Sequence, residues 1–116
     1  MASNYRDLVV WQKSMDLVEK TYAVVRRLPK EENYALSDQM RRAAVSIPSN
    51  IAEGYSRLAS KDYARFLTIA RGSVYELQTQ LLICRRLNYL SEDSVKDAIQ
   101  LSDEIGRMLY SIIVKL

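Results

Sequence analysis

The sequence predicts an all-α protein, an antiparallel up-down-up-down four-helix bundle that forms a single domain over residues 1–116. Composition is the first reason, because 116 residues with only three glycines and two prolines have too few turn formers for many short strands. The second reason is that apolar residues recur every three or four positions in four long segments. The third is that the connections are short, which places consecutive helices antiparallel.

The first two segments span residues 6–28 and 34–58. Pro29 ends the first, because proline cannot continue a helix. The predicted inward residues of the first segment are Leu8, Trp11, Met15, Val18, Tyr22 and Val25. Those of the second are Leu36, Met40, Ala43, Ile47, Ile51, Gly54 and Leu58. Each set forms one apolar stripe that can face a common core.

The third and fourth segments each begin at a serine that can cap a helix N-terminus. Ser60 is the predicted N-cap of the third segment and Ser91 that of the fourth, where the acidic Glu92 and Asp93 suit the first turn. The predicted inward residues of the third are Phe66, Ala70, Val74, Leu77, Leu81 and Cys84. Those of the fourth are Val95, Ala98, Ile105, Met108 and Ile112. Four complementary stripes favour burial against one another over binding to a membrane surface.

The second segment contains a proline in its middle. The apolar stripe keeps its phase on both sides of Pro48, so we expect one helix kinked there instead of two helices. Pro48 frees the carbonyl of Ala44, and the side chains of Ser46 and Asn50 lie close enough in sequence to bond it. With Gly54, these residues form the predicted structural kink. Direct ligand binding by this stretch is the alternative.

Charge is distributed unevenly along the chain. Lys, Arg, Asp and Glu give a net charge of 0 for residues 1–40, +5 for residues 41–86 and −2 for residues 87–116. Cations that face away from the apolar stripes of the second and third segments are Arg42, Arg57, Lys61, Arg65, Arg71 and Arg86, with Tyr75 among them. Such a surface suits a large anion, and nucleic acid is the commonest one in a cytoplasm.

Local ion pairing is the competing interpretation of these charges. Residues three or four positions apart are neighbours on a helix surface, so carboxylates at that spacing can neutralise the arginines. The available pairs are Glu53 with Arg57, Asp38 with Arg41 or Arg42, and Asp62 with Arg65. The charge pattern alone leaves nucleic-acid binding and an ordinary solvated surface both open.

Several apolar residues lie outside the predicted stripes and broaden the apolar arcs. They are Val9, Leu17, Val24, Leu82, Ile99, Leu101, Ile113 and Leu116. Broad arcs indicate a second buried surface, which a homo-oligomer would provide and a partner protein would provide equally well.

The chain lacks most catalytic and metal-binding chemistry. Without histidine it has no Ser-His-Asp or Cys-His system and no histidine-ligated zinc, haem or di-iron site, so we expect no enzyme activity, no metal and no cofactor. Catalysis by Lys, Tyr, Cys84 or carboxylates alone is the remaining alternative. A single cysteine, no signal segment and no long apolar run predict a soluble protein of a reducing cytoplasm with no membrane contact.

Three stretches carry a family resemblance. They are "YRDLVVWQKSMDLV" (5–18), "LSDQMRRAAVSIPSNIAEGYSR" (36–57) and "FLTIARGSVYELQTQLLICRRLNYL" (66–90). With these, the chain resembles the bacterial four-helix bundle proteins that are often encoded in intervening sequences of large-subunit ribosomal RNA genes. The most specific part is the run from Gln39 to Gly54, reinforced by "ARGSVYEL" at 70–77.

The resemblance implies further properties. It implies a ring-like homopentamer, and kinship with the accessory variability-determinant proteins of diversity-generating retroelements, which bind a reverse transcriptase and nucleic acid. Basic residues at positions matching the family are Arg41, Arg42, Arg57, Arg71, Arg85 and Arg86. We therefore expect a non-enzymatic oligomer that binds the backbone of RNA or DNA, RNA above all, as an accessory factor to an RNA or reverse-transcription complex. A scaffold that binds only a partner polypeptide is the alternative.

Overall fold

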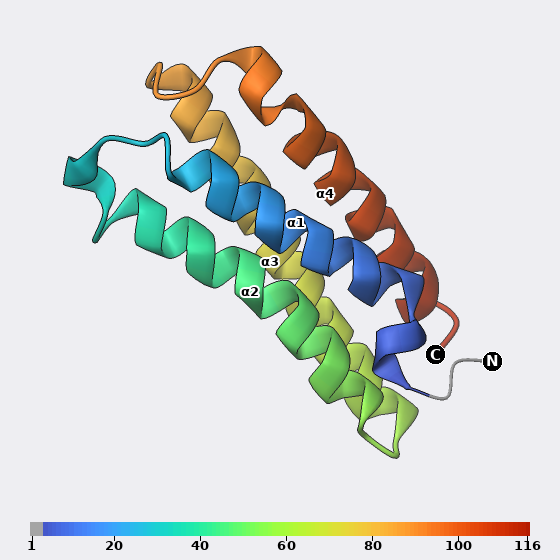
Figure 1. Ribbon diagram of the computed structural model, residues 1–116. Helices are drawn as coiled ribbons and strands as arrows, with labels where there is room; N and C mark the ends of the chain where they lie inside the picture. The colour runs from blue at the N-terminus through green and yellow to red at the C-terminus, as the bar shows by residue number, and fades with distance from the viewer. Residues whose placement is uncertain (1–3) are drawn as a thin grey trace.

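The computed structural model describes residues 4–116, and these form four long α-helices and two short 3-10 helices. The long helices are α1 (Val9–Val25), α2 (Leu36–Tyr55), α3 (Ser60–Arg86) and α4 (Glu92–Ile113), and the short ones are η1 (Tyr5–Asp7) and η2 (Lys30–Glu32). Each long helix packs on the next, and α1 also packs on α4, within a molecule of 44 × 25 × 20 Å (Figure 1). The four-helix bundle predicted from the sequence is confirmed.

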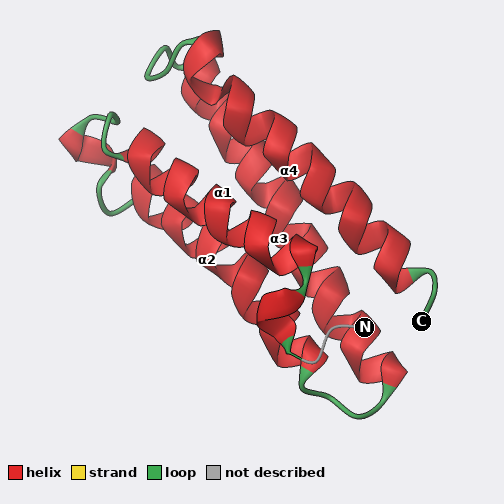
Figure 2. Cartoon of the chain, turned by 45° about the vertical axis from the view of Figure 1, so that its right-hand side comes forward, coloured by secondary structure: helices red, strands yellow, loops and turns green. Residues whose placement is uncertain are grey.

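The two ends of the bundle differ in what they carry. The short turn between α2 and α3, residues 56–59, lies at the same end as the C-terminus (Figures 1 and 2). The connections between α1 and α2 and between α3 and α4 lie at the other end. We call the first the turn end and the second the opposite end.

Apolar residues of all four helices fill the space between them. Every predicted inward residue of α3 is buried, and those of α4 are buried or half-buried. The largest fully buried side chains include Met40, Ile47 and Ile51 of α2 with Leu77 and Leu81 of α3. The apolar periodicity therefore identified the core faces of α2, α3 and α4.

The predicted core face of α1 was only partly right, since Val25 is buried and Leu8, Trp11 and Val18 pack against the core. Leu17 is fully buried and Val24 nearly so, whereas Met15 and Tyr22 are exposed. Two polar residues, Ser14 and Thr21, also lie on the buried face. Their hydroxyls donate hydrogen bonds to the main-chain carbonyls four residues earlier, both at 2.7 Å. Because these satisfied hydroxyls interrupt the buried stripe, the outer apolar stripe gave the stronger periodic signal.

α2 continues through Pro48 without a break, as the phase of its stripe predicted. Pro48 is buried, and the Asn50 amide donates to the Ser46 carbonyl (2.8 Å) and hydroxyl (3.0 Å). The Ser46 hydroxyl in turn bonds Ser73 of α3 at 2.9 Å. The expected bond from Asn50 to the Ala44 carbonyl is thus replaced by bonds to Ser46. The kink at Pro48 stays a prediction.

Two predictions at the turn end were wrong. α2 ends at Tyr55, so Leu58 lies in the turn, where its side chain is fully exposed (105% relative accessibility). Ser60 is not an N-cap, because α3 already begins at Ser60 and its cap residue is Ala59. The other predicted cap is confirmed, since the Ser91 hydroxyl accepts a hydrogen bond from the Ser94 amide at 3.1 Å.

Candidate nucleic-acid interface

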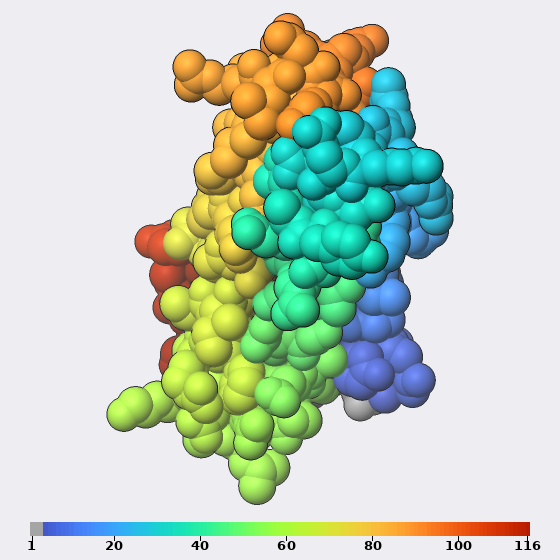
Figure 3. All heavy atoms as spheres, turned by 90° about the vertical axis from the view of Figure 1, so that its left-hand side faces the viewer, coloured from blue at the N-terminus to red at the C-terminus, as the bar shows by residue number. Residues whose placement is uncertain are grey.

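α2 and α3 lie side by side and together form one face of the bundle (Figure 3). All eight cations proposed from the sequence lie on these helices or in the turn between them. They are Arg41, Arg42, Arg57, Lys61, Arg65, Arg71, Arg85 and Arg86. The segment with the excess of positive charge is therefore one structural unit, although its cations have very different surroundings.

At the turn end, two arginines share one aromatic ring. The guanidinium carbon of Arg57 lies 4.8 Å from the centroid of the Phe66 ring, and that of Arg65 lies 4.5 Å from it. Phe66 itself is only 7% exposed. A cation over an aromatic face is attracted by the ring quadrupole, which holds the two guanidiniums in place. Arg57 also has a carboxylate partner, Glu53, at 3.8 Å, whereas Arg65 forms no ion pair within residues 4–116.

The helices approach very closely beneath this ring. A Cβ atom on Gly54 of α2 would lie 2.7 Å from the Cβ of Phe66 on α3. Glycine is therefore required here for close packing, and it lets Phe66 sit tightly under the two arginines. The predicted structural role of Gly54 has this contact as its physical basis.

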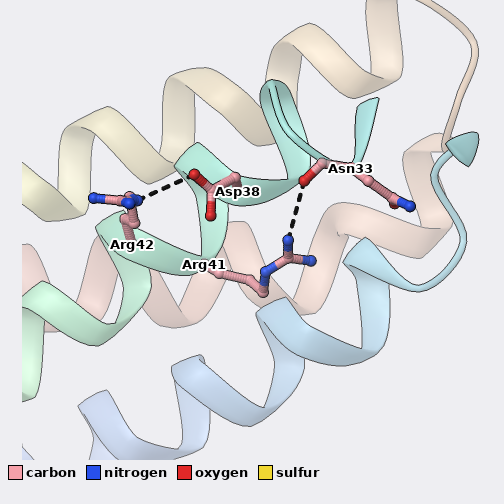
Figure 4. Close-up of polar contacts among 4 residues, drawn as sticks. All are labelled: Asn33, Asp38, Arg41 and Arg42. Carbon is pink, nitrogen blue, oxygen red and sulfur yellow. Dashed lines mark hydrogen bonds and ion pairs between the residues drawn. The ribbon is translucent and has the colours of Figure 1, made fainter. Parts of the chain in front are cut away.

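Most of the cations of the opposite end contact oxygen atoms of the protein itself. Figure 4 shows Arg41 donating to the Asn33 carbonyl at 3.2 Å and Arg42 paired with Asp38 at 3.1 Å. On α3, Arg85 pairs with Glu92 at 3.6 Å. These bonds reduce the charge that this end presents to a ligand, and the exposed Arg86 is the exception.

Arg71 faces α4 and joins it to α3. Its guanidinium carbon lies 5.1 Å from the ring centroids of both Tyr75 and Tyr110, and it donates to the Tyr75 hydroxyl at 3.2 Å. A longer bond of 3.4 Å reaches the Gly106 carbonyl. Arg71 and Tyr75, expected together on the basic face, thus form a contact between helices.

Local pairing accounts for only part of the charge. Of the pairs available at helical spacing, Asp38 with Arg42 and Glu53 with Arg57 form, the latter at a loose 3.8 Å. Within residues 4–116, neither Lys61 nor Arg65 forms an ion pair within 4 Å, and Lys61 is exposed. The turn end therefore keeps cations that are free to meet an external anion.

Groups with chemical reactivity are shielded. Burial raises the pKa of the Cys84 thiol to about 11, and Cys84 contacts the Met40 sulfur at 3.6 Å. A hydrogen bond to Glu32 (2.8 Å) raises the pKa of Tyr89, and burial raises that of Tyr63. All three stay protonated at neutral pH, so they supply no thiolate or phenolate. Among the described residues, no group of three or more Cys, Asp or Glu side chains is arranged to hold a metal ion.

A groove between α1 and α2 offers a second surface. Its volume is about 310 Å³, and its lining is mainly apolar. The lining residues are Tyr5, Trp11, Met15, Val18, Val45, Pro48, Ser49 and Ala52. Three of them, Trp11, Met15 and Val18, belong to the stripe of α1 that the sequence had assigned to the core. None of the residues from which the sequence predicted a second buried surface lines this groove, and two of those residues, Leu17 and Val24, lie in the core instead.

The arginine pair over Phe66 was not predicted. Phe66 was assigned only to the core and Leu58 to the α2 stripe, and Arg57 lies nine residues before Phe66, across a turn. The adjacency of Arg65 and Phe66 in the sequence is the one available signal. No helical spacing brings Arg57 to the same ring.

Comparison with known proteins decides the family. The family model described as 23S rRNA-intervening sequence protein matches residues 6–111. This chain belongs to that family. Among solved structures, the chain is similar to a protein of unknown function from the S23 ribosomal protein family of Bacteroides thetaiotaomicron, with 26% identity and a TM-score of 0.84. The match covers 90% of this chain and 98% of that one. The search of curated proteins found no match.

Membership in the 23S rRNA-intervening sequence protein family confirms the resemblance that the three sequence stretches indicated. The family match spans all four long helices, from η1 to the last turn of α4. None of the helices in residues 4–116 combines the length and the apolar character needed to cross a membrane.

Proposed function

We propose that this member of the 23S rRNA-intervening sequence protein family is a non-enzymatic protein that binds the backbone of RNA or DNA through the α2–α3 face. The observation that carries the proposal is the net charge of +5 in residues 41–86, which form this one face. Cations on a rigid surface release counterions when they meet phosphates, which gives affinity without reading the base sequence. The protected state of Cys84, Tyr63 and Tyr89 supports the non-enzymatic part.

The test is a titration of labelled structured RNA and DNA of matched sequence over a range of salt concentrations. We expect affinity to fall steeply as salt rises. A triple variant, Lys61→Gln/Arg65→Gln/Arg86→Gln, removes three exposed cations that have no ion pair in the described chain. It should weaken binding at least about tenfold.

The matched control removes the same charge from another helix. Lys96→Gln/Arg107→Gln/Lys115→Gln changes three exposed cations on α4 or just after it. This variant should bind within about twofold of the wild type, because long-range charge effects are screened by salt. Absence of binding at low salt, or equal losses in both triple variants, would contradict the proposal.

The proposal includes assembly into a homo-oligomer, supported by the apolar groove between α1 and α2. Met15 and Val45 are 40% and 42% exposed there, and a second copy of the chain would bury them. Sedimentation equilibrium should show an oligomer that Met15→Glu/Val45→Glu dissociates, while Lys20→Glu, at an exposed position of α1 outside the groove, leaves it intact. A monomeric wild type would contradict this part. Assembly would multiply weak phosphate contacts through effective concentration.

The same groove supports a second candidate function, a scaffold for a partner polypeptide. An apolar groove flanked by helices suits an amphipathic segment of another protein, such as a polymerase or reverse transcriptase. Salt separates the two functions, since phosphate binding weakens as ionic strength rises and apolar docking does not. A protein that assembles tightly but binds no nucleic acid at low salt would favour the scaffold.

A further inference from the structure

The turn between α2 and α3 combines an exposed apolar side chain with several cations. Leu58 projects from it with a fully exposed side chain (105%), so it contributes nothing to the core. Arg57 precedes it in the turn, and Lys61 and Arg65 follow in the first two turns of α3, where the exposed Asp62 also lies. A single exposed leucine is ordinary on a protein surface, so the cations beside it are what mark this one.

The cations beside Leu58 are held in place but not neutralised. Arg57 and Arg65 rest on the buried ring of Phe66, which is fixed by the close approach of Gly54. Only Arg57 has a carboxylate partner, Glu53, at 3.8 Å, and both side chains of that pair are about half exposed. Such a pair exchanges readily with water or another anion. The one ring therefore limits the movement of both guanidiniums, which lowers the cost of ordering them when they bind phosphate oxygens.

We propose that the turn end is the contact point for nucleic acid and that it selects unstacked bases. Arg57, Lys61 and Arg65 bind the phosphates on either side of a bulge, loop or frayed end, while Leu58 packs against the exposed base or enters the opened step. Aliphatic wedges between base steps flanked by basic residues are a known means of recognising distorted nucleic acid. This inference rests on the proposed function and adds the location and the class of target.

The charge around Leu58 favours nucleic acid over a partner protein as the ligand of the turn end. A partner protein with an apolar site would gain from Leu58 but not from three cations around it, whereas a polyanion with exposed base faces matches both features. Regular duplex offers phosphates but no accessible base face for a leucine. An RNA with unpaired bases is therefore the best match to this surface.

The experiment measures fluorescence anisotropy with two labelled RNAs, a perfect hairpin stem and the same stem with a central bulge. Wild-type protein should bind the bulged RNA more tightly. Leu58→Ser should lower the affinity for the bulged RNA roughly fivefold and leave the affinity for the perfect stem unchanged. Arg57→Ala/Arg65→Ala should weaken binding to both RNAs at least tenfold and lower the salt slope by about 2.

Matched controls come from the opposite end. Leu87→Ser changes another exposed leucine that follows a helix, and Arg42→Ala/Arg86→Ala removes two arginines from the same helix pair. Leu87→Ser should bind both RNAs within about twofold of the wild type. Arg42→Ala/Arg86→Ala should weaken binding to both RNAs equally, and by less than Arg57→Ala/Arg65→Ala does. Because Arg57 and Arg65 cover Phe66, thermal unfolding is measured for each variant. Lys61 is exposed and forms no ion pair within residues 4–116, so Lys61→Glu tests the site if the double variant unfolds early.

The outcomes separate this inference from the proposed function. If wild-type protein binds with steep salt dependence but only Arg42→Ala/Arg86→Ala weakens it, the turn-end site is wrong and the proposed function stands. If Leu58→Ser binds both RNAs like the wild type, selection of unstacked bases is wrong. If the wild type binds neither RNA at low salt, both proposals fail.

Discussion

At the turn end of the α2–α3 pair the arginines rest on an aromatic ring, whereas at the opposite end most of them contact oxygen atoms. Arg57 and Arg65 lie over Phe66, while Arg42 and Arg85 pair with Asp38 and Glu92. An aromatic ring leaves the charge of a guanidinium intact, whereas a carboxylate offsets it in part. Arg57 has both kinds of contact, since it also pairs with Glu53 at 3.8 Å, and Arg65 has the ring alone. The opposite end has four of these arginines and the turn end two, so the comparison teaches that the number of arginines on part of a face does not decide how much of their charge a ligand can meet.

The largest expected effect tests the packing that supports the turn-end arginines. Gly54→Ala places a Cβ 2.7 Å from the Cβ of Phe66, an atom that cannot move without its backbone. We expect the free energy of unfolding to fall by about 2 kcal/mol, measured by urea denaturation followed by circular dichroism.

The control for this change is Gly72→Ala on α3, where an added Cβ would meet nothing within 4 Å. Alanine is a better helix former than glycine, so this variant should gain about 0.5–1 kcal/mol. If Gly54→Ala is as stable as Gly72→Ala, the two helices do not approach closely at the turn end and Phe66 is not held as described.

The next effect concerns the opposite end and alkaline pH. Burial raises the pKa of Cys84 from 9.0 to about 11, so the folded state favours the neutral thiol. This difference in pKa adds to the free energy of unfolding below pH 9, and the contribution is lost as pH rises through 11. The loss is on the order of 2 kcal/mol. Urea denaturation at pH 7, 9 and 11 should show this loss.

Cys84→Ala should reduce the alkaline loss without abolishing it. The pKa of Tyr89 is raised by its hydrogen bond to Glu32, and that of Tyr63 by burial, and both remain in this variant. An unchanged loss in Cys84→Ala would show that Cys84 is not the titrating group.

A smaller effect is expected midway between the ends, at Asn50. Asn50→Leu removes the two hydrogen bonds to Ser46 and should cost about 1 kcal/mol, with nucleic-acid affinity within about twofold of the wild type. Ser73→Ala removes only the hydrogen bond between the Ser73 and Ser46 hydroxyls, so it should lower the free energy of unfolding by less. If Asn50→Leu folds and assembles normally but loses binding, the stretch around Pro48 is a binding site and not a structural element.

The smallest effect is at the opposite end, where α3 meets its following turn. Asn88 has a φ of +63°, a conformation that glycine adopts without strain. Asn88→Gly should therefore raise the midpoint of thermal unfolding slightly, by the equivalent of about 0.5 kcal/mol. Asn33→Gly is the control, because the φ of Asn33 is −54° and glycine relieves no strain there. Glycine only raises the conformational entropy of the unfolded chain, so the midpoint of thermal unfolding should fall slightly.

The sequence determined the helices and most of their inner faces. Periodicity located the four long helices to within a few residues, and of these four only α4 begins at a side-chain cap, Ser91, as the sequence predicted. The core face of α1 was predicted only in part, because two of its buried residues are polar. The hydroxyls of Ser14 and Thr21 donate hydrogen bonds to carbonyls of their own helix, so burying them costs little free energy. A pattern of residue types cannot show that a hydroxyl is already satisfied.

The sequence also determined which helices carry the positive charge, but the tertiary structure decided what that charge can do. Whether an arginine meets a carboxylate, a carbonyl or an aromatic ring depends on contacts across turns and between helices. Arg57 reaches Phe66 only because α2 and α3 close tightly at Gly54, and Arg71 lies between two tyrosines only because α4 packs beside it. Charge is a property of the residue, and its availability is a property of the fold.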